Sequence, residues 1–227
     1  MTTAEMPDTE RIVMGSVLLD VSMSLDGFIA GPNVGVGLPL GEGGERLHDW
    51  MSSADPDRAG DWHRTGASDL DAEVKQELLV TTGAVVMGRR TFDVGVGPWG
   101  DTPFPVPCFV LTHEARDPLV KESGTFTFVT DGIQGALRRA QAVAGDKHVS
   151  LMGADLAQQF LSAGLLDELH IHLAPVLIGA GTRLFDNLGS NHIELERTRL
   201  IESPLATHLT FRVVRRAVAA AAGRAGR

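Results

Sequence analysis

Short hydrophobic runs and longer amphipathic segments alternate along most of the chain. Runs rich in β-branched and aromatic residues predict strands at 17–23, 84–87, 108–112, 125–129, 148–152 and 168–173. Amphipathic spacing and end signals predict helices at 45–51, 70–78, 131–145 and 153–163. In the second of these segments, Leu70, Val74 and Leu78 recur at four-residue intervals. After residue 181 only strand-like patterns remain, at 193–200 and 207–213.

The alternation of strands and helices predicts a three-layer α/β fold. Its central sheet is mixed and mostly parallel, with helices on both faces, because parallel strands need such crossover connections. The strand-only last third predicts an antiparallel addition at one edge of this sheet. We expect one folded domain at 15–214, a flexible N-terminal arm at 1–14 and an Ala-rich tail at 215–227.

Composition and charge narrow the class of protein. The 227 residues carry a net charge of −9, which disfavours general binding to nucleic acid. The single cysteine, Cys108, allows neither an internal disulfide nor a multi-cysteine metal cage, and it lies in a strand pattern typical of core. We therefore expect a cytoplasmic protein that binds neither nucleic acid nor membranes.

A literal G-x-G-x-x-G occurs at Gly95, Gly97 and Gly100. The dinucleotide-binding fingerprint requires that such a loop follow a strand and open a helix. Here the segment contains Pro98 and runs into DTPFPVP, so it predicts a Gly-rich loop and no Rossmann fold.

Better candidates for ligand binding follow the predicted strands. Gly88, Arg89, Arg90 and Thr91 combine a strand end, two guanidinium groups and a predicted helix start, where backbone N–H groups attract anions. Solvated arginines at a strand end remain the alternative. Two more strand ends have similar character, at Thr112-His113 and at Gly153-Ala154-Asp155, although Asp155 could simply cap its helix. Ligands of open α/β sheets bind where such strand ends converge.

Histidines suggest other chemistry. His170 and His172 lie on one face of a strand, as metal ligands could, but no acidic or sulfur partner has matching spacing, so a structural role is favoured and no metal is expected. His48 and Asp49 are adjacent and would point in different directions on a helix.

The segments VSMSLDGFIAGP, VVMGRRTF, PCFVLTH and LMGADLAQQFLSAGLLDELHIHLAPVLIGAGTRLF, in this order, resemble the dihydrofolate-reductase-like superfamily. The most similar branch is the reductase domain of the bifunctional riboflavin-biosynthesis deaminase/reductase. LGEGGERLHDWM resembles a stand-alone subgroup of that branch. The resemblance covers about 17–214.

This resemblance implies NADPH as the cofactor and a homodimer as the assembly. Residues that match the cofactor-binding segments are Gly88, Arg89, Arg90 and Thr91 for phosphates, Thr112 and His113 near the 2′-phosphate, Gly153, Ala154, Asp155 and Leu156 for the pyrophosphate, and Ser22, Ile29 and Ala30 near the nicotinamide. The chain departs from the pattern at Ala154, where the family has a second glycine. The acid that dihydrofolate reductases carry on their first long helix has no clear match, although Glu45 and Asp49 lie in that stretch.

The expected function is NADPH-dependent reduction of a small pterin-, pyrimidine- or other heterocycle-like substrate. Candidate proton donors are Asp26, His48 and Asp49, and Trp50 and Trp99 could stack on a flat substrate. A non-catalytic nucleotide-binding or sensor module on the same fold is the alternative. A third possibility, a metal-dependent hydrolase, would use His170 and His172.

Overall fold

The structure is a computed structural model that describes residues 15–52, 68–190 and 192–214. The arm and the tail expected at the two ends lie outside the described residues. None of the helices in the described part of the chain has both the length and the apolar character needed to cross a membrane.

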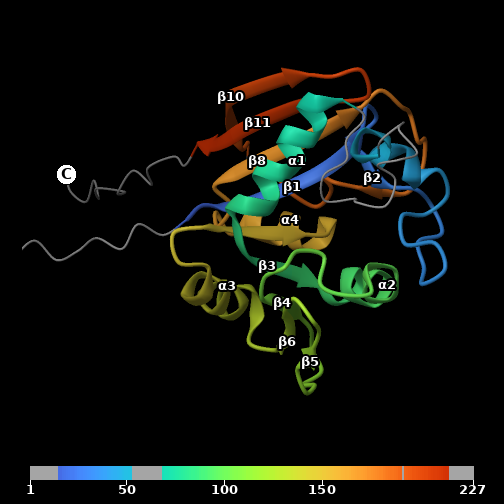
Figure 1. Cartoon of the computed structure of the whole chain (residues 1–227). Coiled ribbons are helices and arrows are strands. Elements are labelled where there is room, and N and C mark those ends of the chain that lie inside the picture. Colours follow the sequence, from blue (N-terminus) through green and yellow to red (C-terminus); the bar gives the residue numbers. More distant parts are fainter. Residues whose placement is uncertain (1–14, 53–67, 191, 215–227) are drawn as a thin grey trace, which may run out of the picture.

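The described residues form a nine-stranded mixed sheet (Figure 1). Its strands, in spatial order, are β10 (Glu194–Glu202), β11 (Thr207–Val214), β8 (Glu168–Ala174), β1 (Val17–Ser24), β7 (His148–Met152), β3 (Thr82–Gly88), β4 (Cys108–Leu111), β6 (Thr125–Val129) and β5 (Leu119–Val120). The strands from β8 to β6 run parallel. β11 and β10 add antiparallel strands at one edge, and β5 adds one at the other. The α/β fold with an antiparallel C-terminal edge is thus confirmed.

Helices cover both faces of the sheet. α3 (Gly132–Ala144) and α4 (Ala154–Ser162) pack on one face, and α2 (Arg89–Trp99) packs on the other. Alternation along β3 explains this division, because Ala84 and Val86 enter the first core while Val85 and Met87 enter the second. The short helix η1 (Gly44–Met51) and α1 (Asp69–Thr81) lie on the α2 side, over β1 and β8. A separate two-stranded sheet joins β2 (Phe28–Ala30) to β9 (Thr182–Arg183).

Beneath α1 and η1 the sheet presents polar side chains instead of a second apolar core. Leu19 on β1 belongs to the apolar core, so its neighbour Asp20 faces the opposite side. His172 on β8 and His208 on β11 are register partners on this polar side, and both are buried. α1 matches this surface, because it buries Asp71 and Lys75 while Leu70 remains 45% exposed.

One predicted loop is wrong. Gly95, Gly97 and Pro98 belong to α2 and not to a Gly-rich loop. Phe92 of this helix is buried, and Trp99 packs against the same apolar cluster. This packing stabilises the helix despite its glycines. A Cβ at Gly95 would lie 2.3 Å from the Trp99 ring, which explains the glycine there without any nucleotide.

Candidate active site

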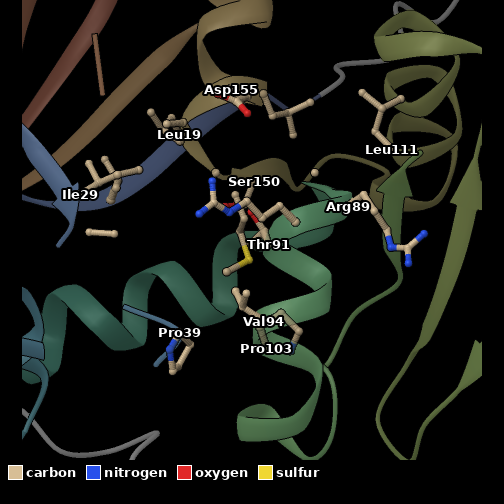
Figure 2. A pocket seen from close by; sticks show the side chains of 18 of the residues that line it. Leu19, Ile29, Pro39, Arg89, Thr91, Val94, Pro103, Leu111, Ser150 and Asp155 are labelled. Atoms are coloured by element: carbon tan, nitrogen blue, oxygen red, sulfur yellow. The ribbon is translucent and has the colours of Figure 1, made fainter. Parts of the chain in front are cut away.

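A cleft of about 1180 Å³ opens where the parallel strands end (Figure 2). Segments that follow β3, β4, β6 and β7 line it, and β1, β2 and η1 form its other wall. Figure 2 shows Leu19, Ile29, Thr91, Leu111 and Ser150, which come from different elements, around one space. Because ligands of open α/β sheets bind at the carboxyl ends of strands, this is the expected position for a site.

Three helices of the described part begin at this cleft. α2 starts after Gly88, α3 after Asp131 and α4 after Gly153. The two glycines have no side chain that could cap, and the Asp131 carboxylate accepts from Arg139 instead of capping its helix. Each helix start therefore offers backbone N–H groups and the positive end of its dipole to an anion in the cleft.

The two arginines at the start of α2 have different surroundings. The Arg89 guanidinium donates from Nε to Asp93 Oδ1 at 2.8 Å and lies 3.7 Å from Glu114. Arg90 is exposed, lines the cleft and makes no ion pair with any described residue. Of the pair, Arg90 has its charge available for a ligand.

Gly153 brings the β7–α4 turn against the start of α2. Its φ is +107°, and a Cβ there would lie 2.6 Å from Thr91 Oγ1. Glycine is therefore required twice over, by its backbone conformation and by the close approach of Thr91. Ala154 is the first residue of α4 and has no positive φ, so its methyl group replaces the family's second glycine without backbone strain.

The remaining residues matched to cofactor binding also line the cleft. They are Ser22, Ile29, Ala30, Thr112, His113, Asp155 and Leu156. Thr112 is buried and donates its N–H to the Val129 carbonyl, while His113 is exposed. The structure thus brings together at one cleft all the residues that the sequence assigns to the cofactor.

Both tryptophans line the same cleft. Trp50 is only 2% exposed; its indole N–H donates to Ser22 Oγ at 2.9 Å, and its ring lies 4.3 Å from the His172 ring, centroid to centroid. Trp99 stacks on Phe126 with ring centroids 6.5 Å apart. Trp50 is consequently a fixed part of the wall, whereas Trp99 sits at the end of α2.

Of the three proton donors expected from the sequence, only His48 lines the cleft. Its Nδ1 is buried without a hydrogen-bond partner among the described residues, and burial lowers its pKa, so the ring is neutral near pH 7. Asp49 pairs with Arg46 at 3.2 Å and does not line the cleft.

Asp26 also lies outside the lining residues of the cleft. Its carboxylate accepts a hydrogen bond from the Ser24 hydroxyl and from the backbone N–H groups of Ile178 and Gly179, at 3.1 and 2.7 Å. These hydrogen bonds, the one from Ser24 first, lower its pKa to about 2. Asp26 therefore ties the β1–β2 turn to the segment after β8 and is not positioned to donate a proton in the cleft.

Sequence reasoning missed a buried chain of acids and histidines beside the cleft. His172 Nε2 lies 3.1 Å from both carboxylate oxygens of Asp20, His172 Nδ1 lies 2.7 Å from His208 Nδ1, and His208 Nε2 lies 2.9 Å from Asp71 Oδ1. Asp20 lines the cleft. Polar residues within otherwise hydrophobic strands, as in VLLDVSMS and THLTF, were the available signal.

Metal and thiol chemistry find no support in the described residues. No group of three or more His, Cys, Asp or Glu side chains in that part of the chain could hold a metal ion. His170 is instead engaged by Glu168 and Asp20, at 3.2 and 3.7 Å. Cys108 is buried in a strand, and burial raises the pKa of its thiol to about 12, as suits a core residue.

Comparison with known proteins gives the chain a family. Residues 16–207 match the RibD C-terminal domain. The chain is 24% identical over 208 residues to the uncharacterized protein YyaP of Bacillus subtilis, covering 86% of this chain and 94% of YyaP. A putative riboflavin biosynthesis protein from a Shewanella species has a similar structure, with a TM-score of 0.65 and 23% identity over 88% of this chain and 99% of that one. Dihydrofolate reductase from Enterococcus faecalis, solved with NADP(H), gives a TM-score of 0.52 and 15% identity over 88% of this chain and 97% of that one. The protein therefore belongs to the RibD C-terminal domain family and has the dihydrofolate-reductase-like fold.

Proposed function

We propose that the protein is an NADPH-dependent reductase that transfers a hydride to a small pterin-, pyrimidine- or other heterocycle-like substrate. The observation that carries this proposal is the convergence on one cleft of three helix starts and of Arg90, which has no ion-pair partner among the described residues. The family match and the likeness to a dihydrofolate reductase solved with NADP(H) support the same conclusion.

The donors at the cleft fit the cofactor. Its pyrophosphate needs N–H donors and close backbone approach, which the α2 and α4 starts offer at Gly88 and Gly153. Its 2′-phosphate needs a cation, and Arg90 is the exposed guanidinium on the lining. The cleft volume of about 1180 Å³ leaves room for a second small molecule beside the dinucleotide.

Bound NADPH would supply the hydride. The protein's part is to hold the two reactants together and to exclude water. Ile29 and Ala30 contribute apolar surface on the β1 side, where Ser22 and Trp50 fix each other through a buried hydrogen bond. The neutral His48 ring adds to the lining of the cleft beside this wall. A flat heterocycle with ring nitrogens and carbonyl groups suits such a wall.

Oxidation of NADPH in the presence of a panel of pterins, pyrimidines and flavins tests the proposal. We expect the purified protein to oxidise NADPH with at least one of these compounds, and an Arg90→Ala variant to need far more NADPH. Tight NADPH binding without oxidation by any of them would favour the nucleotide sensor. Failure to bind NADPH would contradict both functions.

A further inference from the structure

The chain Asp20–His172–His208–Asp71 contains three hydrogen bonds, and their geometry fixes how many protons it holds. Ser68 holds Asp71 in place at one end. The Asp71 N–H donates to Ser68 Oγ at 3.2 Å, and the Ser68 hydroxyl donates to Asp71 Oδ2 at 2.6 Å. As a carboxylate, Asp71 would accept the N–H of His208 Nε2 at its other oxygen, Oδ1, which lies 2.9 Å away.

At the other end, the Asp20 carboxylate accepts from His172 Nε2, with both oxygens 3.1 Å away. Each imidazole thus uses one proton on its Nε2. If these were the only ring protons, two Nδ1 lone pairs would face each other at 2.7 Å, which is repulsive. The contact therefore requires a third proton between the rings, and the pair of histidines carries one positive charge.

The surroundings of the two rings favour His172 as the holder of the extra proton. Burial lowers the pKa of His208, and the neighbouring His172 lowers it further. His172 is 4% exposed at its side chain and packs beneath the Trp50 ring, whose face favours a cation. His208 then accepts from His172 and donates to Asp71, so it acts as a neutral link that keeps His172 protonated.

Of the four side chains, Asp20 is the one that lines the cleft. Its side chain is 12% exposed, whereas that of Asp71 is fully buried. Asp20 also borders a second cavity of about 340 Å³, which His170 lines as well. His172 and His208 also line this second cavity, so Asp20 stands between the buried imidazolium and the cleft only.

We propose that this chain is the proton source of the reductase, with His172 as the reservoir and Asp20 as the group that hands the proton to the substrate. The inference rests on the proposed function. In the step, the Nε2–H bond of His172 breaks and an O–H bond forms on Asp20; that O–H then breaks as a bond forms between the proton and the basic substrate atom left by hydride addition. His172 recovers its proton from solvent through the second cavity, where His170 faces Asp20 at 3.7 Å. One proton from solvent is consumed for each hydride.

This assignment gives the two ends of the chain different roles. Asp20 is the catalytic residue, because it alone of the four borders the substrate space. His172, His208 and Asp71 act through it. The pKa of Asp20 itself, although burial raises it, is held below its ordinary range by His172 and His170, so the resting group is a carboxylate. Other titratable or charged groups near the chain are His48, which interacts with Asp20 and His172, the buried Lys75 on α1, and the residues that line the second cavity, namely Glu77, His148, Glu168, His170 and Arg199.

Nuclear magnetic resonance on the protein labelled with ¹⁵N-histidine tests the proton count without substrate. In the wild type near neutral pH we expect three protonated ring nitrogens on His172 and His208 together, and a single coupled titration of the two rings. In Asp71→Asn the side-chain amide can donate to His208 Nε2, so the His208 ring carries its proton on Nδ1 instead. The three contacts are then satisfied with two ring protons. A wild-type count of two, or independent titration of the rings, would overturn the proposal.

Steady-state kinetics with whichever panel compound is reduced then test whether the chain delivers the proton to it. We expect Asp71→Asn and Asp20→Asn to lower kcat by about 100-fold or more and to change its pH profile, with little change in the KM for NADPH. Glu73→Gln is the matched control, because it removes the same charge from an exposed position on α1. Losses equal to that control would overturn the proposal.

Two further results separate the possible failures. If Asp71→Asn does not fold, Asp20→Asn tests the same chain from its other end, with the ring protons again counted. If the wild type reduces no compound, the proposed function and the delivery step fail together. The ring-proton count then still decides whether the His172–His208 pair carries a positive charge. If reduction occurs but the ring pair is uncharged, only the proton source is wrong.

Discussion

Arg89 and Arg90 are adjacent in sequence, yet their side chains have different partners. Asp93 and Glu114 engage Arg89, whereas Arg90 has no described ion-pair partner and lines the cleft. A phosphate meeting Arg90 would therefore not have to displace a carboxylate. On this difference we propose that Arg90 recognises the 2′-phosphate and that Arg89 supports the start of α2.

Replacing Arg90 with alanine should weaken NADPH binding by about 10- to 100-fold, the usual strength of a charge-assisted hydrogen bond. Binding of NADH, which lacks the 2′-phosphate, should change little. Isothermal titration calorimetry with both cofactors measures the difference. Arg212→Ala, on β11 next to the edge strand β10, is the control. Equal losses for the two cofactors would rule out this role.

Gly153→Ala should destabilise the protein by about 1–3 kcal/mol, because alanine is strained at a φ of +107° and its methyl would collide with Thr91. NADPH affinity should fall as the α4 start moves. Ala154→Gly, one residue later, should leave NADPH binding unchanged or improve it. Thermal unfolding and calorimetry compare the two variants. A severe loss of affinity in Ala154→Gly alone would mean that the turn works differently.

Sequence could predict which residues gather at the cofactor end of the cleft, because those residues sit in short motifs directly after strands. It could not predict the proton chain. Asp20, His172, His208 and Asp71 come from four separate elements, and their contacts depend on strand order and on the placement of α1. Asp26 was attractive as a motif acid, but its carboxylate is taken by backbone N–H groups 152 and 153 residues away.

At the scale of elements, the two sides of β1, β8 and β11 serve different purposes. One side contributes Leu19, Leu169 and Ile171 to the apolar core. The other carries ionisable side chains under α1 and η1. Burying such groups costs free energy unless each is paired. The three hydrogen bonds of the chain Asp20–His172–His208–Asp71 give each of these four side chains a partner. A stable fold could use apolar residues here, so this polar layer indicates function.

His170 makes the stability of this layer depend on pH. Burial lowers its pKa, but the Asp20 carboxylate 3.7 Å away and the hydrogen bond to Glu168 outweigh burial and raise it from 6.5 to about 9. A raised pKa stabilises the folded state fully below pH 6.5, and that contribution is lost as pH rises toward 9. Wild-type protein should therefore lose more stability over this interval than His170→Gln in urea unfolding at each pH. Parallel pH dependences would contradict the pairing.

Hydrophobic periodicity recovered the longer elements because each has a buried face. The predicted strands at 125–129 and 148–152 coincide with β6 and β7. β2, β5 and β9 were not predicted, since two or three residues are too few to show a pattern. The extent of α2 was missed for a different reason: packing against Phe126 overrides the local preference of its glycines and proline.

At the scale of the molecule, the net charge of −9 repels phosphate groups, so a phosphate site needs positive charge and N–H donors gathered in one place, as an exception to the overall sign. We propose that the starts of three crossover helices, with Arg90, which has no ion-pair partner in the described part of the chain, supply that exception at a single cleft. The parallel sheet is what brings these segments together, because its crossover helices all begin at the carboxyl ends of the strands.

We also expect a homodimer. β10 is an edge strand whose residues are almost all exposed, with Leu195 and Leu200 at 40% and 44%. Exposed edges of this kind are commonly covered in solution. Analytical ultracentrifugation should give twice the mass of the chain, and Leu195→Lys with Leu200→Lys should shift it to the monomer if β10 lies at the interface. A monomeric wild type would refute this expectation.

The most direct test of the account is a crystal structure of the protein with NADPH bound. We expect the phosphates at the starts of α2 and α4, the 2′-phosphate at Arg90, and the nicotinamide between Ile29 and the wall that contains Asp20 and Trp50. Phosphates bound elsewhere, or a nicotinamide turned away from Asp20, would contradict the cofactor site and the proton route together.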